Sequence, residues 1–342
     1  MLSRYTCFVL LVSTTLFAES TLPRTGQVKS YNEGGWEVTD GSIKDDGYYQ
    51  KGKDRVLTRN KGIVNDPFYG LQWQDDETKT KAIDVPEGEE SAALYCRRIG
   101  LGDFTNWRLP TYKELSTIFL TQWNPYIDTI FQALPPNDGT DSMTYWSNSN
   151  LAGTTGSWVI HFKDGVSNSD LNDYYHYVRC VRGTTLPKNQ LRSVGNYAID
   201  EKTHLMWEDT PAVRTNLMKW EKAIEYCENL NIEGYKGWRL PNLIELRSIY
   251  DVTVRTNSWR DDVALALGLN VYPDLCTNDT GGGVCSFWSS TSVGPSSQQY
   301  AFTIENGMIG SKNKTDELRV RCVRDRSNPA IITLPAIIHI LF

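Results

Sequence analysis

The sequence predicts an α+β protein built from two tandem domains, and three observations support this prediction. The chain has 342 residues, which is enough for two domains that each bury a core of their own. The pentapeptide Trp-Arg-Leu-Pro-Thr at residues 107–111 recurs as Trp-Arg-Leu-Pro-Asn at residues 238–242. Around each pentapeptide the apolar residues follow a helical period, and further along each half of the chain they follow short strand patterns.

The repeat extends beyond the pentapeptide and indicates a tandem duplication. An offset of 131 residues aligns Cys96 with Cys227, and an offset of 142 residues aligns the Arg-Cys-Val-Arg motifs at 179–182 and 321–324. The change between the two offsets places an insertion of eleven residues in the second copy. A period of this length indicates whole domains, because solenoid repeats are far shorter.

The chain divides into six segments on this basis. They are an expected signal peptide at 1–18, a leader with hairpins at 19–59, a first domain at 60–183, a linker at 184–193, a second domain at 194–326 and an apolar tail at 327–342. The leader is rich in Gly and Asp, and we expect short hairpins that pack against the first domain. The tail is shorter than the roughly 20 apolar residues that span a bilayer, so no transmembrane span is predicted.

Each domain is expected to hold two helices followed by short antiparallel strands. The first helix carries an apolar stripe, at Ala92, Ala93, Cys96 and Ile99 in the first copy and at Trp220, Ala223, Ile224, Cys227 and Leu230 in the second. Asp-Gly at 164–165 and Asn-Gly at 306–307 predict tight hairpins between later strands.

The pentapeptide itself predicts a structural element that leads into the second helix. Its tryptophan supplies an indole to bury, and its last residue opens a capping-box pattern, at 111–114 in the first copy and at 242–245 in the second. Arg108 and Arg239 are each interpreted as the anchor of a partly buried ion pair, the alternative being contact with a ligand.

The cysteines predict a disulfide framework. Removal of Cys7 with the signal peptide leaves six, and export to an oxidising compartment favours pairing. Six cysteines allow fifteen pairings, but a duplication predicts equivalent bonds in the two copies. The predicted bonds are Cys96–Cys180, Cys227–Cys322 and, within the insertion, Cys276–Cys285.

The order of the motifs resembles the Lcl C-terminal domain family, named for the carboxyl-terminal domain of the Legionella collagen-like adhesin. The resemblance rests on Leu-x-Trp, a helix with Cys, Trp-Arg-Leu-Pro with Glu-Leu, Tyr/Phe-Trp-Ser and Val-Arg-Cys-Val-Arg, and it covers residues 60–183 and 194–325. It implies an α+β fold related to C-type lectin-like and formylglycine-generating-enzyme domains on exported bacterial proteins. It also implies adhesion and the binding of sulfated glycans.

No catalytic, metal or cofactor site is predicted. The histidines of the two domains, His161, His176 and His204, lack the His-x-x-x-His spacing of a zinc site, and no phosphate-binding loop or Gly-x-Ser-x-Gly motif is present. The net charge of −6 gives no support to nucleic-acid binding.

The chain is rich in aromatic residues, with 11 Trp and 18 Tyr. Tryptophans present in both copies are assigned to the shared core: Trp73, Trp107, Trp146, Trp207, Trp238 and Trp288. Aromatic residues without a counterpart in the other copy are free to face solvent: Trp36, Trp123, Tyr126, Trp158, Tyr174, Tyr175, Trp259 and Tyr272. All of these except Trp36 form the candidate ligand-binding set. Flat rings beside Asn and Asp suit stacking on sugars or contact with a protein surface.

These observations favour an exported, non-enzymatic binding protein that is periplasmic, secreted or displayed on the bacterial cell surface. Its expected role is adhesion to, or recognition of, a glycan or a surface protein. The alternatives are an oxidase of the formylglycine-generating type, which would need a reactive cysteine pair, and a purely structural envelope protein.

Overall fold

The computed structural model describes residues 20–76, 88–122, 124–135, 143–150, 156–171, 175–187, 191–250, 286–294, 296–305 and 307–326, with the backbone alone for 88–91 and 171. The expected signal peptide, the Cys276–Cys285 bond and the apolar tail lie outside these residues.

The first copy holds two antiparallel sheets and the two expected helices. One sheet has the order β3 (Thr58–Asn60), β4 (Ile63–Asp66), β5 (Leu71–Gln74) and β9 (Val181–Gly183). The other has the order β6 (Thr144–Asn150), β7 (Gly156–His161) and β8 (Val166–Leu171). The helices are α2 (Gly88–Arg98) and α3 (Tyr112–Leu115), and a 3₁₀ turn, η1 (Ser116–Ile118), continues α3.

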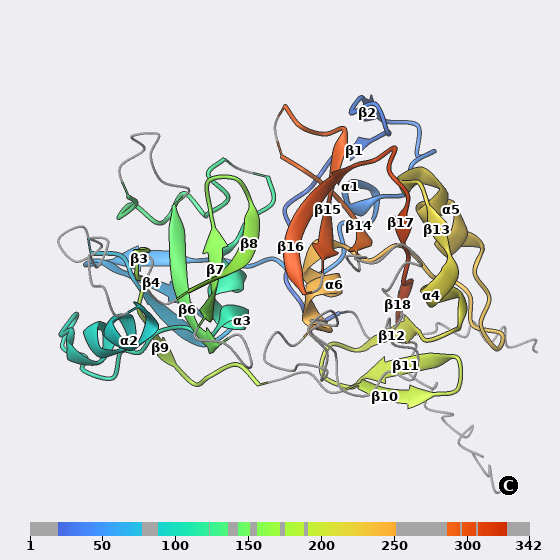
Figure 1. Ribbon diagram of the computed structural model, residues 1–342. Coiled ribbons are helices and arrows are strands. Elements are labelled where there is room, and N and C mark those ends of the chain that lie inside the picture. Colours follow the sequence, from blue (N-terminus) through green and yellow to red (C-terminus); the bar gives the residue numbers. More distant parts are fainter. Residues whose placement is uncertain are drawn as a thin grey trace, which may run out of the picture.

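The second copy repeats this arrangement (Figure 1). Its first sheet has the order β10 (Leu191–Val194), β11 (Tyr197–Asp200), β12 (Leu205–Glu208) and β18 (Val323–Asp325). Its second sheet has the order β13 (Leu217–Met218), β17 (Leu318–Arg319), β14 (Ser286–Ser292), β15 (Tyr300–Glu305) and β16 (Met308–Asn313). The helices are α4 (Ala212–Thr215), α5 (Trp220–Asn229) and α6 (Leu243–Ser248). The repeated strand order confirms the tandem α+β organisation.

Two details of the expected organisation change. Strand β10 begins at Leu191 and pairs with β11, so the last residues assigned to the linker are part of the first sheet of the second copy. The second copy also has an additional single-turn helix, α4, before the predicted pair.

The local sequence signals act as predicted at both helix starts. Thr111 and Asn242 cap α3 and α6 and form complete capping boxes, with Glu114 and Glu245 as the reciprocal partners. The hairpins also form, with Gly165 and Gly307 at positive φ of 75° and 85°. The β15–β16 turn has the two residues predicted, whereas four residues separate β7 from β8.

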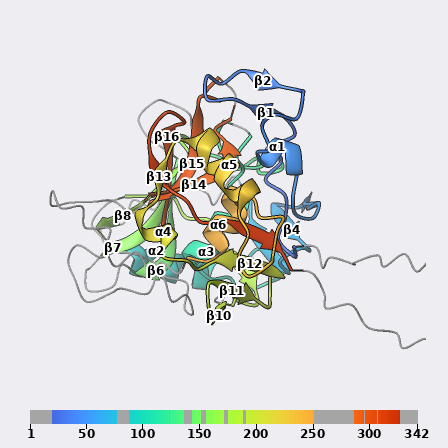
Figure 2. The same ribbon diagram turned by 90° about the vertical axis from the view of Figure 1, so that its right-hand side faces the viewer.

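The leader forms its expected hairpin but packs against the second copy, which corrects our expectation that it would cover the first. Strands β1 (Ser30–Tyr31) and β2 (Glu37–Val38) and helix α1 (Asp46–Tyr49) lie beside the second copy in both views (Figures 1 and 2). Gln27 Oε1 accepts a hydrogen bond from the Ser292 N–H at 2.7 Å. Only the end of the leader, β3, joins a sheet of the first copy. Asp46 and Gln27 of the leader bond to Thr291 and Ser292 of β14, about 250 residues away in sequence, and no local pattern reveals such contacts.

The two copies share a continuous apolar core. One cluster of buried residues contains Trp73 from the first copy and Trp207 from the second. At the junction the Phe302 ring lies 5.8 Å from the Phe119 ring and 5.8 Å from the Tyr126 ring, both in edge-to-face geometry. Because aromatic packing crosses the junction between the copies, the two domains are packed against each other and are not independent units joined only by a linker.

Candidate functional site

Each Trp-Arg-Leu-Pro segment is a structural element, as the sequence predicted. Trp107 and Trp238 are buried, and their indole N–H groups donate to the carbonyls of Leu101 and Tyr235 at 3.3 and 2.8 Å. All six tryptophans assigned to the core are buried. These residues hold the fold and are not available to a ligand.

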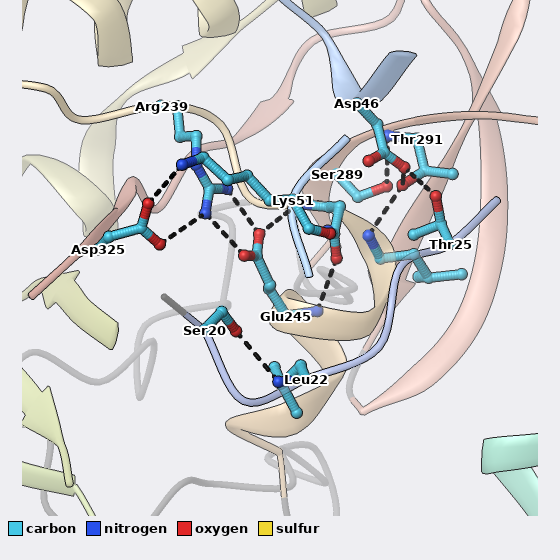
Figure 3. Close-up of polar contacts among 12 residues, drawn as sticks. Ser20, Leu22, Thr25, Asp46, Lys51, Arg239, Glu245, Ser289, Thr291 and Asp325 are labelled. Carbon is cyan, nitrogen blue, oxygen red and sulfur yellow. Dashed lines mark hydrogen bonds and ion pairs between the residues drawn. The ribbon is translucent and has the colours of Figure 1, made fainter. Parts of the chain in front are cut away.

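The arginine of each pentapeptide pairs with the glutamate of its own capping box. Arg108 donates twice to Glu114, with both distances 2.7 Å, and Arg239 donates twice to Glu245 at 2.6 and 2.7 Å. The environments differ, because the Arg108 side chain is 27% exposed and the Arg239 side chain only 4%. A third charge, the carboxylate of Asp325, lies 3.7 Å from Arg239 (Figure 3). The ion-pair interpretation of both arginines is confirmed.

The Thr291 hydroxyl of strand β14 connects helix α6 to the leader. Thr291 Oγ1 accepts a hydrogen bond from the first N–H of α6, at Leu243, at 2.9 Å and donates to Asp46 Oδ2 at 2.8 Å. In the first copy Ser149 accepts the equivalent bond from Tyr112, also at 2.9 Å. The leader therefore docks on a helix start that both copies build in the same way.

Asp46 is the most unusual ionisable group of this contact (Figure 3). It is buried, and its Oδ2 atom also accepts a hydrogen bond from Thr25 at 2.5 Å. Burial raises the pKa of Asp46 to about 7, the threonine hydroxyls oppose that shift, and the nearby carboxylates of Glu245 and Asp45 add to it. The docked leader therefore favours a protonated Asp46.

This burial predicts a pH-dependent stability that Asp46→Asn removes. The folded state holds the Asp46 proton up to about pH 7, whereas the unfolded chain releases it near the ordinary pKa of 3.8, so stability falls as pH rises between these values. Between about pH 5 and 7 we expect the wild type to lose roughly 2 kcal/mol relative to Asp46→Asn, which stays neutral. Urea unfolding at several pH values measures this difference. An Asp46→Asn variant with the pH dependence of the wild type would contradict the assignment.

Lys314 is buried under the leader, and its ammonium group has hydrogen-bond acceptors in the leader and in β14. Its ammonium group donates to the carbonyls of Tyr31 and Asn32 at 3.1 and 3.2 Å and to Ser292 Oγ at 2.9 Å, and it lies 3.8 Å from the centre of the Trp220 ring. Burial lowers the pKa of Lys314 to about 7. These contacts hold the leader in place and leave Lys314 unavailable to an external anion.

Both disulfides that the duplication predicts are present. Cys96 is bonded to Cys180, and Cys227 to Cys322, so the first long helix of each copy is tied to its closing segment. All four residues are completely buried. Disulfides of this kind fit a protein exported to an oxidising compartment.

The seven candidate ligand-binding aromatics differ in their positions in the structure. Trp123, Tyr174, Trp259 and Tyr272 lie outside the described residues. Tyr175 is 51% exposed, as expected for a contact residue.

Tyr126 and Trp158 are in the core, so the expectation that they face solvent is wrong. Tyr126 stacks on Phe119 at 5.5 Å and lies against Phe302 of the second copy. Trp158 has an aromatic equivalent in Phe302, because the carbonyls of both accept a 2.7 Å hydrogen bond from the serine of the Trp-Ser motif, Ser147 or Ser289. The β14–β15 connection is two residues longer than the β6–β7 connection. A comparison of the two copies at a constant offset of 142 residues therefore does not align Trp158 with Phe302.

The most exposed large apolar side chain of the described residues is Trp36, at 75%. It lies in the β1–β2 hairpin, where the Asn32 side chain accepts a hydrogen bond from its N–H at 3.0 Å. The preceding Gly35 has φ +80°, and a Cβ at that position would lie 2.8 Å from the backbone nitrogen of Gln299. This close approach places the hairpin next to Tyr300, which is 37% exposed. Trp36 belongs to the leader and has no counterpart in either copy, and this was the sequence signal for it.

A cavity of about 430 Å³ lies between the two copies. Tyr112 and Ser116 line it from the first copy, Ile244 and Arg247 from the second, and Leu22 from the leader. The two helices that follow the pentapeptides, α3 and α6, therefore face the same space. No sequence pattern indicated this cavity, because it exists only where the copies meet.

Among the residues that the structure describes, neither a membrane-spanning helix nor a metal-binding cluster is present. No helix among them is long and apolar enough to cross a membrane. Within the same residues, no group of three or more His, Cys, Asp or Glu is arranged to hold a metal ion.

The fold and disulfides define a class of disulfide-stabilised, tandem-domain α+β protein. The Lcl C-terminal domain model matches the chain twice, at residues 62–182 and 196–324. The chain belongs to this family, and the resemblance seen in its motifs is confirmed. Comparison with curated proteins finds no significant match.

Proposed function

We propose that the chain is an exported, non-enzymatic protein that recognises a glycan or a surface protein outside the cytoplasm. Membership of the Lcl C-terminal domain family and two buried disulfides support export and binding. Periplasmic, secreted and cell-surface locations are all compatible with this role.

The fold supports a lectin-like relationship. In each copy an early strand pairs with the last one, β5 with β9 and β12 with β18, and the disulfide joins the first long helix to the segment before that last strand. Such a closed frame leaves the intervening segments free to vary, which is where binding residues concentrate in proteins.

The observation that carries the proposal is the exposed Trp36 on the hairpin whose Gly35 approaches the backbone of Gln299. A tryptophan that is 75% exposed on a hydrogen-bonded hairpin keeps a large flat surface in water. Rings of this kind serve as anchors in binding sites, since they bury much area with few rotatable bonds.

Replacing Trp36 by alanine is expected to weaken ligand binding by about tenfold or more, the loss typical of a central aromatic anchor. The measurement is a glycan array followed by titration of the best ligand with the full exported chain. Val56→Ala is the matched control, because Val56 is also exposed, at 68%. If Trp36→Ala retains binding and Tyr175→Ala loses it, the result contradicts a contact at Trp36 and places the contact surface on the first copy.

The proposal differs from the oxidase alternative in its cysteine chemistry. An oxidase of the formylglycine-generating type needs a reactive thiol pair, whereas four of the six mature cysteines are disulfide-bonded and buried. We expect no free thiol in the purified protein and no copper-dependent oxygen consumption. Oxygen consumption that disappears on replacing Cys276 or Cys285 would favour the oxidase.

A further inference from the structure

The two copies meet through equivalent elements, as the subunits of a symmetric dimer do. Strand β8 of the first copy lies beside β16 of the second (Figure 1), and the Ile309 N–H donates to Ser167 Oγ across the junction at 2.8 Å. The cavity lies at the same junction, between α3 with η1 on one side and α6 on the other. The duplication has thus produced a site that neither copy contains alone.

The lining of the cavity is aromatic and cationic. Rings come from Phe68, Tyr69, Tyr112 and Tyr250, and the charged residues of the lining are Lys113, Lys202 and Arg247. None of the described residues that line the cavity carries a carboxylate. This composition suits a molecule with an apolar body and a negative charge.

Arg247 is the lining cation that has a buried donor atom for which the described part of the chain provides no acceptor. Its Nη1 atom is buried and has no hydrogen-bond partner there. By contrast, the nearby Arg55 is paired with Asp66. Burial lowers the pKa of the Arg247 guanidinium. An unsatisfied buried cationic donor is costly, and such groups in native proteins call for an explanation.

Comparison of the copies shows that the arginine is not required by the fold. The offset that aligns the pentapeptides places Ser116 of the first copy at the position of Arg247. Ser116 satisfies its hydroxyl locally, by donating to the Lys113 carbonyl at 2.7 Å. The equivalent helix in the first copy therefore ends with serine at this position, and the guanidinium is an addition specific to the second copy.

We propose that the cavity between the copies binds a small carboxylic acid with an aromatic or other apolar body. The carboxylate accepts hydrogen bonds from Arg247, and the body packs among the rings of Phe68, Tyr69 and Tyr112. Arginine suits this role because its guanidinium donates along two parallel directions to a carboxylate. This site is separate from the surface around Trp36, and its test does not depend on that proposal.

The experiment is calorimetric titration of the full exported chain with acetate, phenylacetate and 3-phenylpropionate, each compared with its neutral amide. We expect both aromatic acids to bind more tightly than acetate and roughly tenfold or more tightly than their amides. Arg247→Ser, which copies the first domain, should abolish this preference. Arg192→Ser should leave it unchanged, because Arg192 is an exposed second-copy cation that pairs with Glu201 and does not line the cavity.

A second variant keeps the test valid if Arg247→Ser is unstable. Thr185 is an exposed residue that lines the cavity, so Thr185→Trp should block the cavity and abolish binding without altering either core. Equal affinity for acids and amides, no binding of either aromatic acid, or unchanged binding in Thr185→Trp would overturn the proposal.

Discussion

Replacing both Cys227 and Cys322 by alanine is expected to lower the free energy of unfolding by up to about 4.7 kcal/mol. The bond closes a loop with a sequence separation of 95 residues, and opening it returns conformational freedom to the unfolded chain. Urea unfolding of the full chain without reductant measures the loss.

The first copy provides the matched comparison for this prediction. Its bond between Cys96 and Cys180 has a separation of 84 residues, for which the same loop model gives about 4.6 kcal/mol. The two double variants should therefore lose nearly equal stability. A loss confined to one of them would show that loop closure is not the dominant effect.

Glu245→Gln is expected to destabilise the protein by about 3 kcal/mol, because it leaves the buried Arg239 guanidinium without its bidentate partner. Burial opposes the charge on Arg239, whereas the carboxylates of Glu245 and Asp325 raise its pKa. Asp325, at 3.7 Å, remains in the variant and keeps the loss at the lower end of the range for broken buried pairs.

The equivalent substitution in the first copy, Glu114→Gln, is the control. The Arg108 side chain is 27% exposed, so water hydrates its charge after the pair is broken. We expect a loss of about 1–2 kcal/mol there, measured by the same urea unfolding. Equal losses at the two sites would mean that burial does not decide the effect.

Sequence comparison within the chain identified those features that both copies encode at matching positions. Cys96 and Cys227 lie on helices of the same period, and each returns to a cysteine in the same closing motif, so the bonds followed from the repeat. The capping boxes after Trp107 and Trp238 were equally predictable, because a cap depends on residues three apart.

The exposure of single aromatics was not predictable in the same way. Trp158 and Tyr126 have no identical partner at a constant offset, yet both are buried, since one has Phe302 as its equivalent and the other packs on Phe302 across the junction. The presence of a ring in one copy only was therefore an unreliable sign of exposure. It was correct for Tyr175, and Trp36, a leader residue without a counterpart in either copy, is exposed as well.

The sequence by itself determined the duplication, the α+β class, the disulfide pairs of the two copies and the structural role of the pentapeptide. Each of these depends on short spacings that occur twice, so one copy checks the other. Only the tertiary structure decided that the leader covers the second copy, that Asp46 is buried against Thr291, and that a cavity with Arg247 lies between the copies. These features arise from contacts between residues far apart in the chain that occur once, and such contacts leave no periodic or repeated signal.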